Sequence, residues 1–304
     1  MKEFETVEEF EAIAPTPKAE STGKKFLTMR WVDTKEKSRV VCREFAIGAR
    51  DDLFAAASTP TTHLIIDALA CIHRWSRAIG DISRAFLHVP EDEEVFAEPP
   101  AEWTERERQK TEEAGEIWVS LVWRLLKVFY GRRKAAKMWV DWLAAILVKR
   151  CGLERSTSAP QFFVLRVGDR TAAVIEVHMD DLHCGGHREV LQKIGGEIAK
   201  DLKIKNWKVY VFGEPCFYTH LRRERRSAAE ACHIKPNPVH IKRCAELLGL
   251  EQAKAADTPL ASGDRGEESE DTQHVTNAEA VLYRRIVCIL LHVVIDRANT
   301  RIFN

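Results

Sequence analysis

The chain has 304 residues, 45% of them hydrophobic and 30% charged, so it can bury a substantial core in one large or two ordinary domains. Its 46 basic and 46 acidic residues balance, which excludes a global basic field and leaves nucleic-acid binding to local clusters. Apolar runs are too short to span a bilayer, and the first residues do not resemble a signal peptide. We therefore expect an intracellular protein, cytoplasmic or nuclear, with no membrane partner and with its eight cysteines reduced.

Local patterns predict the first elements in chain order. Residues 1–24 carry proline, serine and glycine signals typical of a flexible leader. Residues 25–45 alternate in polarity, which predicts two strands around a charged turn at 33–37. A Ser/Thr-rich start and helical apolar spacing predict a helix within 58–75. Residues 77–90 predict a short strand that runs into a turn or helix.

The strongest helix signal lies over residues 133–152. Trp139, Leu143 and Ile146, with Trp142, form one apolar stripe typical of core packing, and Gly152 is a good C-terminal stop. Further elements follow from the same reasoning. They are a hairpin at 161–179 around Gly168-Asp169, a helix at 189–202, a hairpin at 205–225, a helix at 238–250, an acidic linker at 262–271 and a last helix at 279–296.

Two adjacent carboxylates, Asp180 and Asp181, follow the apolar strand signal in "VHMDDLHCGG". Like charges held this close repel, and a divalent cation is the common remedy. Carboxylate oxygens suit Mg²⁺, and Asp81 in "GDISRAF" ends another short strand and offers a third ligand. The alternative is an ordinary polar hairpin turn, because Asp is favoured in turns.

A zinc site is a second alternative in the same segment. His178, His183, Cys184 and His187 lie close together in sequence, and Cys184 and His187 have an acceptable separation. A second ligand pair of comparable spacing is missing. The histidines are therefore better read as strand or surface residues.

Four blocks of the chain, in order, resemble the reverse transcriptase domain of copia-type LTR retrotransposons. They are "KSRVVCREF" (37–45), "GDISRAFLHVPEDEEVFAEPP" (80–100), "LKVFYGRRKAAKMW" (126–139) and "VHMDDLHCGG" (177–186). Later segments are also similar: "FYTHL", "HIKPNPVHIKRCAELLGL", "DTPL" and "YRRIVCILLHVVIDRANTRI". The order and spacing of the blocks carry the resemblance more than any single block does.

The resemblance implies an α+β right-hand polymerase fold. Fingers and palm would occupy residues 25–225, and a thumb-like or connection-like region would occupy 226–304, ending before any RNase H domain. The chain would then be a fragment of a Pol polyprotein, whose RNase H and integrase regions are absent from it, or a stand-alone remnant.

The resemblance also implies a two-metal nucleotidyl transfer from dNTP to a primer 3′-hydroxyl on an RNA or DNA template-primer duplex. Asp81 and Asp180 would be the principal ligands of two Mg²⁺ ions, for which Mn²⁺ could substitute. Asp181 would complete the catalytic carboxylates, and the Ile82 carbonyl would be a backbone ligand.

Four further residues are expected at the nucleotide. Lys37 and Arg39 share a strand face that the resemblance places against the triphosphate, the alternative being a solvated face. Phe86 would exclude the sugar 2′-hydroxyl, the alternative being a core position. Lys134 would lie near the nascent base pair.

The chain departs from the family pattern at three positions. His178 stands where the family usually has Tyr, Lys134 where it has Gln, and Glu44 where it has Gly. Two alternatives to an active polymerase therefore stay open. One is a degraded, silent remnant that folds and at most binds nucleic acid, and the other is a metal-dependent phosphohydrolase that uses the same carboxylates.

Overall fold

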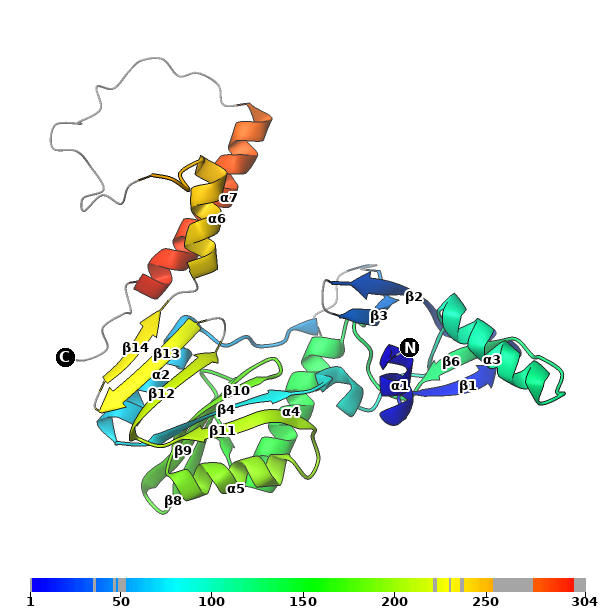
Figure 1. Cartoon of the computed structure of the whole chain (residues 1–304). Helices are drawn as coiled ribbons and strands as arrows, with labels where there is room; N and C mark the ends of the chain where they lie inside the picture. Colours follow the sequence, from blue (N-terminus) through cyan, green and yellow to red (C-terminus); the bar gives the residue numbers. More distant parts are fainter. Residues whose placement is uncertain are drawn as a thin grey trace. The chain divides into compact units, whose positions relative to one another are not determined.

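The computed structural model describes residues 2–34, 37–45, 48, 53–220, 223–229, 231–235, 238–253 and 276–297. The chain divides into two compact units, Met1–Tyr210 and Val211–Asn304 (Figure 1). Both units contain helices and strands, so the expected α+β class is confirmed. The division falls after Tyr210, earlier in the chain than the expected boundary at 225.

The first unit contains a five-stranded sheet that includes the predicted hairpin. Its strands in spatial order are β1 (Ile13–Pro17), β6 (Leu121–Leu125), β5 (Val95–Ala97), β2 (Lys25–Asp33) and β3 (Ser38–Arg43). Helix α3 (Ala101–Glu113) packs Trp103 edge-on against Trp123 of β6, with ring centroids 5.4 Å apart. These indoles belong to one buried cluster that holds this sheet together.

The structure corrects the flexible leader expected over residues 1–24. Residues Lys2–Glu9 form helix α1, β1 pairs antiparallel with β6, and a short 3₁₀ helix, η1, follows at Lys18–Ser21. Phe4 and Val7, one helical turn apart, are buried in the core of the five-stranded sheet. Apolar spacing in α1 thus outweighed the Pro, Ser and Gly signals, and Pro15 and Pro17 lie within β1 while Ser21 ends η1.

A six-stranded sheet forms the rest of the first unit (Figure 1). Its strands in spatial order are β11 (Ile204–Tyr210), β4 (Ser76–Ile82), β10 (Asp181–Gly186), β9 (Arg170–His178), β8 (Phe162–Val167) and β7 (Glu154–Arg155). Helices α4 (Ala135–Cys151) and α5 (Arg188–Ile198) share one buried cluster with the sheet. Helix α2 (Pro60–Ile72) packs against β9 and β10 and forms a second cluster with Val174.

Helix α4 supports the turn between β9 and β10. Trp139, Leu143 and Ile146 of the predicted stripe are buried, whereas Trp142 is 38% exposed. The Trp139 indole Nε1 donates a hydrogen bond to the Met179 carbonyl at 2.8 Å. A core side chain therefore holds the backbone directly before the paired carboxylates.

The hairpin expected over residues 205–225 does not form. Strand β11 pairs antiparallel with β4, and β12 (Gly213–His220) pairs with β13 (Arg223–Ala229) in a separate sheet. Gly80 of β4 makes room for β11, because a Cβ there would lie 2.6 Å from the Trp207 ring. Strand β11 therefore pairs with the free edge of β4, whereas the local pattern predicted that it pairs with the next strand in sequence.

The second unit contains the sheet β12-β13-β14, with β14 at Ala231–Lys235, and two helices, α6 (Pro238–Leu248) and α7 (Asn277–Arg297). Both helices were predicted. The expected acidic linker at 262–271 lies outside the described residues. Within the described part of the chain, no helix is long and apolar enough to span a membrane.

Candidate active site

Three carboxylates from two chain segments meet where β4 ends and β10 begins. Asp81 lies directly opposite Asp181 in the antiparallel β4–β10 pair. The Ile82 N–H donates a hydrogen bond to the Asp180 carbonyl at 2.8 Å, which fixes the neighbouring turn against β4. The structure thus brings Asp81 to the Asp180-Asp181 pair across about a hundred residues of sequence.

The turn that carries Asp180 is a tight hairpin between β9 and β10. Met179 has a positive φ of 56°, a conformation that is uncommon for a residue with a side chain. His178 pairs with Asp181 across the hairpin, and its Nδ1 is hydrogen-bonded to the Ser58 hydroxyl. The hairpin-turn alternative therefore describes the local backbone correctly, but this turn also faces Asp81.

Burial and neighbouring negative charge raise the pKa of two of these carboxylates, Asp81 and Asp181. Burial, followed by the charges of Asp180 and Asp81, raises the pKa of Asp181 to about 6. Burial and Asp180 also raise the pKa of Asp81, against the opposing influence of Lys205 and Lys37. Burial and repulsion both disfavour the charged form of these groups, and a bound cation would relieve that cost.

The donor chemistry of this site fits a hard divalent cation such as Mg²⁺, because all the side-chain donors are oxygens. Among the described residues, however, no three His, Cys, Asp or Glu side chains form a preformed metal-binding group. A cation would have to draw the carboxylates together. The zinc alternative also lacks a ligand set, since His183 lies buried beside Asp67, with Nε2 3.6 Å from Oδ1.

Tyr130 joins two of the residues expected at the nucleotide. The Arg39 guanidinium lies 4.7 Å from the centre of the Tyr130 ring, and the centroid of the Phe86 ring lies 5.0 Å from that of Tyr130. Phe86 is half-buried in the 3₁₀ helix η3 (Ala85–His88), and Lys37 is exposed. No sequence pattern singled out Tyr130, although it lies in the family-like segment 126–139.

Gly131 explains how Tyr130 comes to lie beside the basic strand. The Cys42 N–H donates a hydrogen bond to the Tyr130 carbonyl at 2.8 Å. A Cβ on Gly131 would lie 2.1 Å from the Cys42 carbonyl oxygen, and its φ is 85°. Only glycine permits this close approach of the two backbones.

Lys134 is engaged by acidic side chains. Its Nζ lies 2.8 Å from Asp92 Oδ1 and 2.6 Å from Glu93 Oε1. It belongs to a set of ion-paired residues that we call the charge cluster. The charge cluster comprises Lys25, Glu44, Glu91, Asp92, Glu93, Arg132 and Lys134. The structure therefore does not present Lys134 as an uncompensated cation for a nucleotide phosphate.

Arg132 is the buried centre of the charge cluster. Its side chain is 1% exposed and binds Glu91 through two hydrogen bonds, from Nε and Nη2, each 2.9 Å long. Its Nη1 lies 2.8 Å from Glu44 Oε2 as an ion pair, without the angles of a hydrogen bond. Glu44, one of the departures from the family pattern, is thus a structural partner of this arginine.

Lys205 is a second residue that the sequence analysis missed. It lies opposite Asp81 in the β11–β4 pair, is exposed, and lowers the pKa of Asp81. No local pattern could have identified it, because its relevance depends on the pairing of β11 with β4. It places a cation beside one member of the carboxylate group.

Comparison with known proteins identifies a family whose sequence pattern matches most of this chain. The family described as "Reverse transcriptase (RNA-dependent DNA polymerase)" matches residues 15–213. The chain is 23% identical over 253 residues to the retrovirus-related Pol polyprotein from transposon TNT 1-94 of Nicotiana tabacum. That alignment covers 79% of this chain and 18% of the tobacco protein, so the chain spans under a fifth of that relative.

Two solved structures show distant similarity. A foamy viral protease-reverse transcriptase in complex with double-stranded DNA is 10% identical, with a TM-score of 0.42 over 80% of this chain and 37% of the other. Telomerase from Candida albicans with a telomeric RNA fragment is 8% identical, with a TM-score of 0.47 over 77% and 49%. The family match covers most of the chain and includes all three carboxylates. The chain belongs to the reverse transcriptase (RNA-dependent DNA polymerase) family.

Proposed function

We propose that this chain is the polymerase part of a copia-type retrotransposon Pol polyprotein and catalyses RNA-directed DNA synthesis. The observation that carries the proposal is the placement of Asp81 opposite Asp181, beside Asp180. In this assignment the five-stranded sheet belongs to the fingers, the six-stranded sheet to the palm, and the second unit to a thumb-like region. RNase H and integrase activities would belong to other parts of the polyprotein.

The carboxylates would hold the catalytic metals. Asp81 and Asp180 would be the principal ligands of two Mg²⁺ ions, with Asp181 and the Ile82 carbonyl completing the site. When bound, such ions activate the primer 3′-hydroxyl and stabilise the departing pyrophosphate. The raised pKa values of Asp81 and Asp181 support this role, because a bound cation would relieve their repulsion.

The basic strand β3 would orient the nucleotide. Lys37 is exposed directly before this strand and influences Asp81 electrostatically, so its charge lies near the carboxylates. Arg39, held over the Tyr130 ring, would contact the triphosphate from a fixed position. The substrates would be a dNTP and an RNA or DNA template-primer duplex.

Primer extension by the purified full chain tests the proposal. We expect template-directed addition of dNTPs with Mg²⁺ or Mn²⁺, and its loss in the double variant Asp180→Asn/Asp181→Asn. Degradation of nucleic acid or release of phosphate without a template would instead identify a metal-dependent phosphohydrolase.

A silent remnant is the second candidate, because the charge cluster engages Lys134 and Arg132 with carboxylates. These cations would then add little to binding of a template-primer duplex. Duplex binding without extension, in both Mg²⁺ and Mn²⁺, would favour the remnant. Metal-dependent extension would exclude it.

Phe86 tests the proposed nucleotide site separately. We expect Phe86→Ala to raise rNTP incorporation relative to dNTP, because the ring would no longer exclude the 2′-hydroxyl. If Phe86 only fills the core, the substitution should cost about 3–5 kcal/mol of stability and leave sugar discrimination unchanged. Incorporation rates measured together with denaturant unfolding separate the two roles.

A further inference from the structure

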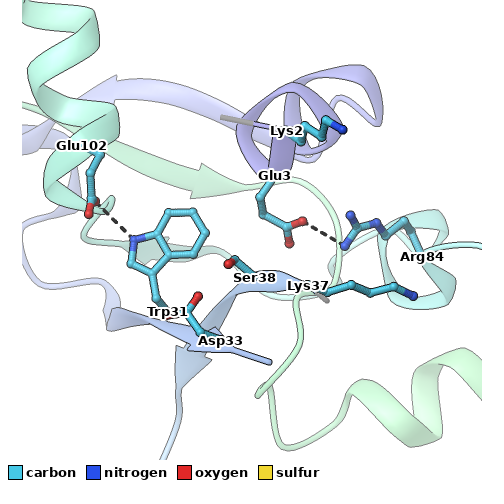
Figure 2. Close-up of a pocket in the computed structure, with 8 residues that line it drawn as sticks. All are labelled: Lys2, Glu3, Trp31, Asp33, Lys37, Ser38, Arg84 and Glu102. Carbon is cyan, nitrogen blue, oxygen red and sulfur yellow. Dashed lines mark hydrogen bonds and ion pairs between the residues drawn. The ribbon is translucent and has the colours of Figure 1, made fainter. Parts of the chain in front are cut away.

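A cavity of about 560 Å³ lies in the first unit beside the start of β3 and the residue before η3 (Figure 2). Two of the cationic side chains that line it are Lys37 and Arg84. Lys37 already belongs to the proposed nucleotide site. Arg84 follows Asp81 by three residues and directly precedes η3, which carries Phe86. The cavity therefore adjoins the proposed nucleotide site on the side of the basic strand.

An acidic side chain from α1 reaches into this cavity. Glu3 is only 6% exposed, and its Oε2 lies 2.9 Å from Arg84 Nη1 as an ion pair. Figure 2 shows the Glu3 carboxylate directed at the Arg84 guanidinium. Oε2 has no partner with hydrogen-bond geometry among the described residues. Burial of a carboxylate costs free energy of desolvation, and a carboxylate with an incomplete set of partners recovers only part of that cost.

Tyr130 connects this ion pair to the rest of the site. Burial raises the pKa of the Tyr130 hydroxyl, and the charges that act on it include Arg39, Arg84, Asp180 and Glu3. Arg84 and Glu3 therefore lie within electrostatic range of the residue that contacts Arg39 and Phe86. The Arg84 backbone is fixed in the left-handed region, with φ 56° and ψ 43°, which limits where its side chain can reach.

We propose that Arg84 binds the phosphates of the incoming nucleotide together with Lys37, and that Glu3 is an internal anion that the triphosphate displaces. The inference rests on the proposed polymerase function. A guanidinium binds phosphate oxygens in a planar, bidentate manner, and a triphosphate carries several negative charges where Glu3 offers one. Glu3 and nucleotide would therefore compete for Arg84, and α1 would set the affinity of the site.

Competition for Arg84 predicts that substitutions of Glu3 and of Arg84 change the dNTP KM in opposite directions. We expect Glu3→Gln to lower the dNTP KM in primer extension about tenfold, a usual coupling between groups that share one partner, with kcat little changed. Arg84→Ala should raise the KM by at least a similar factor. In the double variant Glu3→Gln/Arg84→Ala, the Glu3 substitution should have no further effect. An equal benefit of Glu3→Gln with and without Arg84 would overturn the proposal.

A matched control is available on the same helix. Glu8 of α1 pairs with Arg106 and does not line the cavity. Glu8→Gln removes one carboxylate from α1 and should leave the dNTP KM unchanged. A fall in KM equal to that of Glu3→Gln would show that the net charge of α1 acts, and not the Glu3–Arg84 pair. Thermal melting of each variant checks folding, and Glu3→Asp, which retracts the carboxylate, provides a second test if Glu3→Gln unfolds.

Binding of inorganic triphosphate to the full chain, measured by calorimetry without metal, needs no turnover. We expect tighter binding to Glu3→Gln and weaker binding to Arg84→Ala than to the wild-type chain. If binding follows this order but no primer is extended, the phosphate site stands and the polymerase proposal fails. If primers are extended but Glu3→Gln alters neither triphosphate binding nor the dNTP KM, the polymerase proposal stands and this inference fails.

Discussion

The charge cluster and the carboxylate group at β4 and β10 both gather acidic side chains, but the charge cluster joins them to cations through ion pairs, whereas the lysines near the carboxylate group act on it only through their charge. Arg132, Lys134 and Lys25 each contact at least two carboxylates there. Burial and neighbouring carboxylates instead raise the pKa of Asp81 and of Asp181, and Lys37 and Lys205 offset the shift of Asp81 only in part. The first arrangement contributes to holding the fold, whereas the second leaves negative charge available for a ligand.

The two regions differ in the backbone segments that carry their charged residues. The charge cluster joins the end of β3, the loop before β5 and the segment before α4, which are distant in sequence. The carboxylates lie at strand ends and in a turn held by the Trp139 indole. Charges that stabilise the fold therefore cross-link distant segments, whereas the carboxylates are carried by two paired strand ends and the adjoining turn. Four substitutions or changes of condition test this contrast.

Removing the centre of the charge cluster should have the largest effect. We expect Arg132→Ala to lower the free energy of unfolding by about 3–5 kcal/mol, because buried Glu91 would lose its cation and Glu44 would keep only Lys25. Urea unfolding measures this loss. Arg108→Ala, which removes an exposed ion pair with Glu105 on α3, is the control and should change stability by about 0.5 kcal/mol or less. Equal effects of the two variants would show that the charge cluster is not structural.

Removing a carboxylate from the second region should affect activity without loss of stability. We expect Asp81→Asn to lower primer extension roughly 10²–10³-fold, the usual cost of losing one preorganised electrostatic group. Its melting temperature should stay equal or rise, since repulsion with Asp180 and Asp181 decreases. Asp201→Asn, which removes a carboxylate paired with Arg150, should retain activity. A strongly destabilised Asp81→Asn would contradict the contrast.

Lys134 was predicted at the nucleotide, whereas the structure places it in the charge cluster. We expect Lys134→Gln to cost about 1 kcal/mol of stability, since Asp92 and Glu93 are partly exposed to solvent. The salt dependence of template-primer binding should not change, because the lysine charge is already compensated. A shallower salt dependence in Lys134→Gln would instead show that Lys134 contacts a phosphate.

Acid should weaken the charge cluster gradually, which is the smallest expected effect. Hydrogen bonds from Lys134 and Lys25 hold the pKa of Glu93 well below its ordinary value of 4.5. A carboxylate with a lowered pKa stabilises the fold above its unfolded-state pKa, and this contribution is lost as the pH falls toward the folded-state value. The urea concentration at the unfolding midpoint, measured from pH 7 to pH 3, should therefore decrease once the pH is lowered below about 5. The decrease should be less steep in Glu93→Gln.

Much of the local structure followed from the sequence. The Thr59 cap and Pro60 define the start of α2, the apolar spacing defines α4, and Gly152 ends α4 in a left-handed conformation. The turn at 168–169 joins β8 and β9 as expected. These features were predictable because caps, turns and periodicity act between residues close in sequence. The motif blocks also identified the family, which the match over residues 15–213 confirms.

Tertiary structure alone decided which segments met. Strand β11 pairs with β4 rather than with the next strand, and that pairing places Lys205 opposite Asp81. The acidic residues before β5 neutralise Lys134, whereas the sequence showed only a basic run beside it. Helix α1 packs into the core and directs Glu3 at Arg84, although the same residues read as a flexible leader. Local sequence predicted most of the helices and strands and the carboxylate pair. The strand edges and charges available in three dimensions determined their partners, because pairing and ion-pair energies depend on distance in space and not on separation along the chain.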